Sequence, residues 1–384
     1  MSVKYYRNIL FAMLFSICSL IYVSVYNDVS SIYGNTAVSG NGSISINEGG
    51  SDMNPIIAAE STEGVSEENT DEKDNTVHMV MPSGKPIGIY VKTKGVMVIG
   101  TGEIQTLQGN NVSPCRNLIE TGDYIMEING TEVNDKEGLI NAIEECRDEE
   151  IIMKVNRKGS EIDIAVTPIL SSNKKYMLGL WVKDDIAGIG TLTYIDENGF
   201  GALGHSINDN DTGELFDISD GAIYETELVN IVKSDGEHPG RLEGIIDYSS
   251  SNVIGRVKNN TLYGIKGYMT KNAYENLASG EWMPIAQKEE AHLGDALILS
   301  SVSGKPEYYE IEITGVDVSD SSGNKGLEIV INDSRLLQLT SGIVQGMSGT
   351  PIIQDGKLLG AVTHVFLRDS ARGYGTFVEN IMSN

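Results

Sequence analysis

The chain has few cysteines and no motif typical of a metal enzyme. Its 384 residues include three cysteines, Cys18, Cys115 and Cys146. Their spacing forms neither a metal motif nor a disulfide framework. A Cys115–Cys146 disulfide is one alternative, and two free thiols are the simpler one. The zinc-protease signature His-Glu-x-x-His is also missing from the sequence. We therefore expect no catalytic metal and no cofactor.

Positive charge and proline are also scarce. Lys and Arg number 28 against 54 Asp and Glu, which gives a net charge of −26. Binding to nucleic acid needs clustered positive charge, so this class of partner is excluded. Prolines number only 9, whereas there are 43 glycines among many Val and Ile runs. This composition favours a mainly β fold, and the length allows about two domains plus tails.

One apolar run lies near the N-terminus. It is ILFAMLFSICSLIYVSV, residues 9–25, and a membrane helix needs roughly 17 to 25 such residues. Lys4 and Arg7 precede it and no Ala-x-Ala cleavage site follows. An uncleaved anchor is therefore favoured over a signal peptide. The positive flank predicts residues 1–8 in the cytoplasm and the bulk of the protein outside it.

Residues 26–81 have a different composition, rich in Ser, Asn, Gly and acidic residues. Such a segment buries too little apolar surface to offset its chain entropy. We expect a disordered acidic tether here, with order beginning near residue 82. A tether of this kind is easily reached by proteases.

Residues 82–170 contain an ordered set of β and helical signals. Two β runs, 87–91 and 96–99, flank a Lys-Thr-Lys-Gly turn, and GDYIMEINGTEV at 122–133 predicts a strand, a tight turn and a strand. A helix is predicted in 134–146. This order resembles a PDZ domain, which implies peptide binding by strand addition and a carboxylate-binding loop near Gly95–Val98. The alternative is a small structural β domain that orients its neighbour.

Residues 174–384 consist of short strand patterns separated by glycine-rich turns. Few helical runs interrupt them. So many strands in one segment are typical of a pair of β-barrels or a sandwich.

The stretch QGMSGTPII, residues 345–353, places Ser348 in a glycine-rich loop before a strand pattern. It could be a plain turn or a nucleophile loop. A serine nucleophile needs an adjacent base, and its tetrahedral intermediate needs N–H donors, here those of Gly346 and Ser348. Glycine lets the loop curl so that both donors face one point. The polar turn QDGK and a second strand follow, as in chymotrypsin-like serine proteases.

The base must come from one of only five histidines, which are His78, His205, His238, His292 and His364. His205 ends a strand pattern in GFGALGHSIND and begins a polar loop, a common place for a catalytic side chain. A structural role is the alternative for any single histidine. His205 also precedes Ser348 along the chain, which is the chymotrypsin-like order.

A carboxylate should orient the histidine, but spacing does not choose one. Candidates between the two residues are Asp209, Asp211, Asp217, Asp220, Asp235, Asp247, Asp295, Asp317, Asp320 and Asp333. Asp333 stands at the end of the strand pattern in LEIVINDSRLL.

Several stretches together resemble one family. GFGALGHSI, DTGELFDISDGAIY, GIVQGMSGTPIIQDGKLLGAVTHVF and GYGTFVENIM resemble the stage IV sporulation protein B peptidases of endospore-forming Firmicutes. The order of anchor, tether, PDZ-like segment and peptidase also matches. The resemblance implies a membrane anchor, a PDZ-like domain and a chymotrypsin-like double β-barrel with a triad of His205, Asp333 and Ser348.

The same resemblance implies a function in signalling. Such a peptidase lies in the forespore membrane, faces the space between forespore and mother cell, and cleaves itself. It then cleaves a regulatory subunit of the sigma-K processing complex, which releases an intramembrane metalloprotease that matures sigma-K. Two alternatives remain. One is an anchored PDZ scaffold with an inactive peptidase-like domain. The other is an envelope quality-control protease of the high-temperature-requirement type, in which PDZ domains follow the protease.

Overall fold

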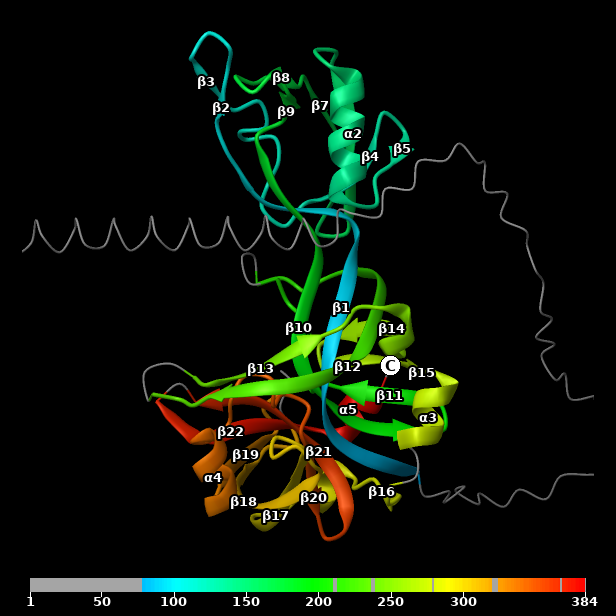
Figure 1. The fold of residues 1–384 in the computed structure, drawn as a ribbon, viewed down its shortest axis with the longest axis vertical. Coiled ribbons are helices and arrows are strands. Elements are labelled where there is room, and N and C mark those ends of the chain that lie inside the picture. Colours follow the sequence, from blue (N-terminus) through cyan, green and yellow to red (C-terminus); the bar gives the residue numbers. More distant parts are fainter. Residues whose placement is uncertain are drawn as a thin grey trace, which may run out of the picture. The chain divides into compact units, whose positions relative to one another are not determined.

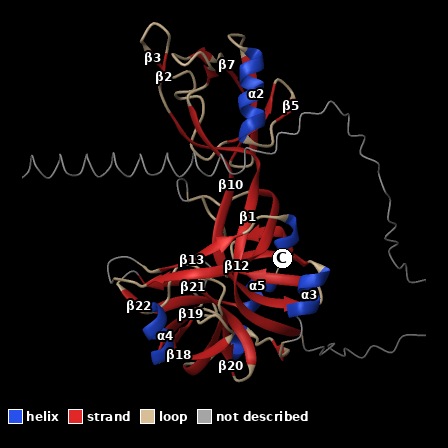
Figure 2. Ribbon diagram, viewed as in Figure 1, coloured by secondary structure: helices blue, strands red, loops and turns tan. Residues whose placement is uncertain are grey.

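The computed structural model describes residues 78–384, except 210–212, 236–238, 278–279, 320–323, 367 and 384. The predicted cytoplasmic segment 1–8, the anchor 9–25 and the tether up to residue 77 lie outside the described residues. Among the described residues, no helix is long and apolar enough to cross a membrane. Strands dominate this part of the chain (Figure 2).

The first described strand, β1 (Met79–Thr101), differs from the sequence prediction in two ways. Residues 79–81 belong to the strand, although we predicted them as the end of the tether. Residues 87–91 and 96–99 lie in this same strand and do not form a hairpin. The register of β1 against β10 (Leu180–Asp196) shifts between Lys92 and Met97. The Lys-Thr-Lys-Gly stretch is therefore a bulge, which bends a strand without reversing it.

One end of β1 belongs to a small lobe with a core of its own. Its other strands are β4 (Tyr124–Ile128), β5 (Thr131–Glu132), β6 (Ile151–Arg157) and β7 (Ser160–Val166). They pack against α2 (Lys136–Cys146), which Asp135 caps by accepting a hydrogen bond from Gly138 N. The helix and the β4–β5 turn lie where the sequence predicts them. Cys115 and Cys146 are both free thiols, and burial raises the pKa of Cys115 to about 12.

The carboxylate-binding loop that we expected near Gly95–Val98 is not a loop in the structure. Val96 and Met97 pair with β4 on one side of β1, while Met97 and Val98 pair with β10 on the other. The side chains of Val96, Met97 and Val98 are fully buried. A strand that is paired on both sides has no row of free N–H groups for a peptide carboxylate.

The remaining strands close into two rings, which we call ring 1 and ring 2. Ring 1 contains β1, β10, β11 (Gly199–Ala202), β15 (Gly264–Met269), β14 (Val253–Thr261) and β12 (Ile218–Val232), closed by the β12–β1 pairing. Ring 2 is a closed barrel of β17 (Gly294–Ser300), β18 (Glu307–Val316), β19 (Leu327–Ile331), β22 (Asp369–Phe377), β21 (Lys357–Phe366) and β20 (Pro351–Gln354). Figure 1 shows the strands of ring 2 gathered together, in orange and red for the most part.

The small lobe also holds two short ribbons, formed by β2 (Ile104–Gln105) with β3 (Asn111–Val112) and by β8 (Ile169–Leu170) with β9 (Tyr176–Met177) (Figure 1). The two rings carry β13 (Arg241–Ile246), which pairs with β12, and β16 (Met283–Pro284), which pairs with β1. The other helices are α3 (Lys271–Leu277), α4 (Ser334–Thr340) and α5 (Val378–Met382).

The predicted limits 82–170 and 174–384 divide elements that the structure joins. β1 and β10 pair along nearly their whole lengths, from the small lobe into ring 1 (Figure 1). The middle of β1, from Ile87 to Thr93, also pairs with β12. Ring 1 therefore needs residues from before the predicted peptidase segment.

Candidate active site

The loop between α4 and β20 carries Ser348. Gly346 and Gly349 both have positive φ, +99° and +96°. A Cβ on Gly349 would lie 2.2 Å from the carbonyl oxygen of Thr191 and 2.5 Å from the amide nitrogen of Leu203. Real Cβ atoms do not approach backbone this closely, so only glycine fits. The small residues that the sequence singled out are thus required by a tightly packed loop.

Strand β10 of ring 1 holds this loop through three hydrogen bonds. The Thr191 hydroxyl donates to the Gly346 carbonyl at 2.7 Å, and the Thr191 amide donates to the Ser348 carbonyl at 3.0 Å. The Thr193 hydroxyl donates to the Gly349 carbonyl at 2.8 Å. On its other side the loop meets β21 of ring 2, where the Gly349 amide donates to Val362 O at 2.8 Å. Ser348 therefore lies between the two rings.

Two amides of this loop are available as oxyanion donors. Met347, Gly349 and Thr350 each donate their N–H to a backbone carbonyl. The N–H groups of Gly346 and Ser348 have no acceptor among the residues that the structure describes. Both residues are half-buried, so these amides lie where a substrate can reach them. Two unpaired amides beside a serine hydroxyl are what a developing oxyanion requires.

The Ser348 hydroxyl has a backbone partner in this structure. Its Oγ donates to the Thr363 carbonyl of β21 at 2.9 Å. Within the described part of the chain, no hydrogen bond joins Oγ to His205. A rotation about the Cα–Cβ bond would release the hydroxyl from Thr363, and active-site hydrogen bonds often form only when substrate binds.

His205 lies where β11 ends, at a turn that the backbone makes unusually sharp. Leu203 and Gly204 both have positive φ, +74° and +72°. A Cβ on Gly204 would lie 3.1 to 3.4 Å from side-chain carbons of Thr363, Thr376 and Ala361 in ring 2. The Leu203 amide also donates to the carbonyl of Thr191, the same residue whose amide binds the Ser348 carbonyl. The turn before His205 thus packs against the strands that flank Ser348.

The tautomer of His205 is fixed by its own backbone neighbourhood. Nδ1 lies 2.8 Å from the Ser206 carbonyl oxygen. A carbonyl only accepts, so Nδ1 carries the proton and Nε2 is left with a free lone pair. Burial lowers the pKa of His205, and the hydrogen bond to Ser206 partly offsets this shift. The imidazole is therefore neutral at neutral pH, as a general base must be.

The structure does not bring Asp333, the expected third member of the triad, to His205. Asp333 caps α4, and its Oδ1 accepts from Arg335 N at 2.8 Å and Nε at 3.1 Å. Its Oδ2 accepts from Arg335 Nη2 at 2.6 Å and Glu310 N at 3.3 Å. These bonds to Arg335 lower the pKa of Asp333 to about 2. Among the described residues its side-chain partners are thus Arg335 and Glu310, and no hydrogen bond joins it to His205.

Sequence reasoning did not select the histidine that lies nearest to His205. The ring of His364 in β21 has its centroid 5.2 Å from that of His205, with the planes inclined by 40°. It follows Thr363, the residue that accepts the Ser348 hydroxyl. The only signal in the sequence was the place of His364 on the strand that follows the Ser348 loop. The sequence does not show which neighbours that strand has.

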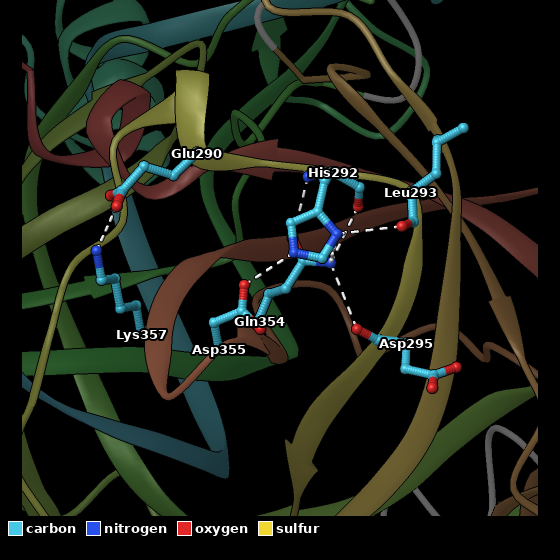
Figure 3. Close-up of polar contacts among 7 residues, drawn as sticks. All are labelled: Glu290, His292, Leu293, Asp295, Gln354, Asp355 and Lys357. Carbon is cyan, nitrogen blue, oxygen red and sulfur yellow. Dashed lines mark hydrogen bonds and ion pairs between the residues drawn. The ribbon is translucent and has the colours of Figure 1, made fainter.

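The other described histidines have ion-pair partners. His78 lies 3.3 Å from Asp196. His292 lies 2.8 Å from Asp355 in an exposed cluster beside the β20–β21 turn (Figure 3). There the Gln354 amide donates to the carbonyls of His292 and Asp295, and Lys357 pairs with Glu290. This cluster fastens the turn to the chain that leads into β17. His238 lies outside the described residues.

A comparison with protein families identifies the chain. The family described as SpoIVB peptidase S55 matches residues 174–382. This chain belongs to the SpoIVB peptidase family. It is a serine endopeptidase. The match spans ring 2, most of ring 1, and both Ser348 and His205.

Solved structures with some likeness are also proteases. The Mycobacterium tuberculosis protease Rv3671c in an inactive form is 14% identical, with a TM-score of 0.25, over 50% of this chain and 78% of that one. The HtrA-type protease AlgW with a decapeptide is 10% identical, with a TM-score of 0.29, over 79% of this chain and 62% of that one. At such TM-scores no geometry is carried over, so the site rests on its own contacts. A comparison with curated protein sequences found no match.

Proposed function

We propose that this peptidase is an anchored signalling endopeptidase of sporulation. Residues 9–25 hold it in the forespore membrane, with the bulk of the chain facing the space between forespore and mother cell. Its substrates are its own tether and a regulatory subunit of the sigma-K processing complex, whose cleavage releases an intramembrane metalloprotease. The family match supports this proposal, together with the apolar segment and the acidic tether in the sequence. A PDZ-like role for the small lobe belongs to the same proposal.

In the proposed chemistry Ser348 is the nucleophile and His205 the base. Nε2 of His205 takes the hydroxyl proton as Oγ bonds to the substrate carbonyl carbon. The oxyanion is stabilised by the N–H groups of Gly346 and Ser348. The C–N bond then breaks, and Nε2 returns its proton to the leaving amine. Water hydrolyses the acyl-enzyme by the same steps in reverse order.

The orienting role falls to a backbone carbonyl. Ser206 O holds Nδ1–H of His205 at 2.8 Å, as the carboxylate does in a Ser-His-Asp triad. A carbonyl dipole stabilises the imidazolium less than a full negative charge does. We therefore expect a slow enzyme whose rate depends strongly on how His205 is held.

The observation that carries the catalytic proposal is the packing of the turn before His205 against the strands that flank Ser348, beside two unpaired amides. It is tested with the full-length protein, purified in detergent micelles and treated with a fluorophosphonate probe. We expect the probe to label the wild type and Ser348→Ala to lose both labelling and tether cleavage. Thr363→Ser retains the backbone carbonyl and serves as a folded control. Unchanged tether cleavage in Ser348→Ala would restore the inactive-scaffold hypothesis.

The signalling proposal needs its own experiment. The full-length peptidase is co-expressed with the regulatory subunit, the metalloprotease and the precursor of sigma-K. We expect the regulatory subunit to be cut and sigma-K to mature with the wild type but not with Ser348→Ala. If casein were cut as fast as the regulatory subunit, a quality-control protease would be the better description.

A further inference from the structure

His364 lies at the proposed site but has no role in the mechanism above. Strand β21 passes Ser348 through Val362 and Thr363, which accept the Gly349 amide at 2.8 Å and the Ser348 hydroxyl at 2.9 Å. His364 is the next residue. The contact between Thr363 and Ser348 therefore also brings the imidazole of His364 to the proposed site.

The rings of His364 and His205 meet without a hydrogen bond among the described contacts. Their centroids are 5.2 Å apart and their planes are tilted by 40°, which is within the range for packed aromatic pairs. The two residues come from different rings of the fold, His205 from the loop after β11 and His364 from β21. Their contact is therefore fixed only when ring 1 and ring 2 are packed together.

A single hydrogen bond leaves His205 under-determined. The bond from Nδ1 to Ser206 O fixes one edge of the imidazole, but the ring can still rock about that edge. Misplacement by about 1 Å can cost a factor of on the order of 100 in rate. A second ring packed against His205 removes this freedom and covers that side of the imidazole, while His364 itself is exposed on the protein surface.

We propose that His364 is a positioning residue, whose ring holds the imidazole of His205 in the orientation that presents Nε2 to Ser348. This inference rests on the proposed roles of Ser348 and His205. Because the contact is made by ring packing, the shape of the side chain at this position matters and its nitrogen atoms do not.

The charges around the pair agree with a packing role. His364 faces His205, Lys325 lies near it, and Tyr374 of β22 stands opposite it in the strand register. Burial, His205 and Lys325 lower the pKa of His364 to about 4. His364 is therefore neutral where His205 works as a base, and two neutral rings can pack without repulsion.

The test compares two replacements of similar bulk in the full-length protein in detergent. His364→Phe keeps a ring without nitrogens, and His364→Gln keeps polarity without a ring. The fluorophosphonate labelling rate is measured from pH 5 to 9, with thermal unfolding of each variant. We expect His364→Phe to label within about threefold of wild type. We expect His364→Gln to label on the order of 10- to 100-fold more slowly.

The pH profile separates positioning from a general loss of stability. Without the ring, water reaches His205 and relieves the burial that lowers its pKa. The midpoint of the rising limb should therefore move to higher pH in His364→Gln and stay in place in His364→Phe. A purely structural role would lower the unfolding temperature and leave this midpoint unchanged.

Control variants decide which hypothesis fails. His292→Ala removes an exposed histidine elsewhere on ring 2 and should label at the wild-type rate. The inference is overturned if His364→Gln matches wild type in rate and midpoint, or if His364→Phe is as slow as His364→Gln. If Ser348→Ala still labels, the proposed site itself is wrong, which is a separate result.

Discussion

The surroundings of Ser348 and of Asp333 differ in how their polar groups are used. Both residues stand in loops of ring 2, beside α4. Around Asp333 both carboxylate oxygens are bonded, to Arg335 and Glu310 N. Around Ser348 two amides and Nε2 of His205 have no partner within the described residues. Saturated polar groups stabilise a fold, whereas polar groups left open beside a nucleophile are available to a substrate.

The largest effect should come from removing the base at the Ser348 site. We expect His205→Ala to lower the labelling rate by on the order of a thousandfold or more, because the hydroxyl then has no proton acceptor. The fold should persist, since among the described residues the only hydrogen bond of the His205 side chain is to the Ser206 carbonyl. The measurement is the labelling rate together with circular dichroism. If a folded His205→Ala were labelled at the wild-type rate, the open polar groups around Ser348 would have no catalytic use, and the contrast with the Asp333 region would fail.

Replacing Asp333 should have the opposite effects: it should lower the stability of the fold and change the labelling rate little. We expect Asp333→Ala to lower the free energy of unfolding by about 1 to 2 kcal/mol, because α4 loses its cap. Labelling, normalised to folded protein, should stay within about threefold of wild type. Arg335→Gln is the matched control, since it removes the ion pair and keeps the cap. A rate loss in Asp333→Ala as large as that of His205→Ala would show that Asp333 belongs to the active site.

The stability difference between wild type and Asp333→Ala should also depend on pH. The pKa of Asp333 is lowered to about 2 in the folded protein, against roughly 3.9 in an unfolded chain. A carboxylate whose pKa is lower in the folded protein stabilises the fold at any pH above its unfolded pKa. This stabilisation is lost as the pH falls towards 2. The difference in stability between wild type and Asp333→Ala should therefore shrink between pH 4 and pH 2, as measured by urea unfolding.

The smallest effect should come from the His292 cluster, which resembles the Asp333 region in holding its imidazole and two of its carboxylate groups in ion pairs (Figure 3). The hydrogen bond to Asp355 raises the pKa of His292. A histidine whose pKa is higher in the folded protein stabilises the fold at any pH below its unfolded pKa of about 6.5. This stabilisation is lost as the pH rises through the pKa of the folded protein. The melting temperature of wild type should exceed that of His292→Gln slightly at pH 6, and the two should converge by pH 9. The opposite trend would show that the ion pair does not form.

The local conformations of the candidate site could be predicted because their signals are local. Positive φ at Gly346 and Gly349, and a loop that follows β11 at His205, are properties of a few adjacent residues. The same holds for the helix in 136–146 and its cap at Asp135. The Asp333 prediction was also local, but the Asp-Ser-Arg sequence that ends the strand is itself a capping arrangement. In the structure Asp333 caps α4, and its place in a triad stays a prediction.

The sequence by itself determined that this chain is a mainly β serine peptidase with Ser348 in a glycine loop and His205 upstream of it. Only the tertiary structure decided that β1 runs through a predicted domain boundary into ring 1, that the Ser206 carbonyl lies beside Nδ1 of His205, and that His364 packs on His205. Local conformation depends on neighbouring residues, which a sequence displays. Contacts between residues more than a hundred positions apart depend on strand register and ring closure, which arise only when the whole chain is packed.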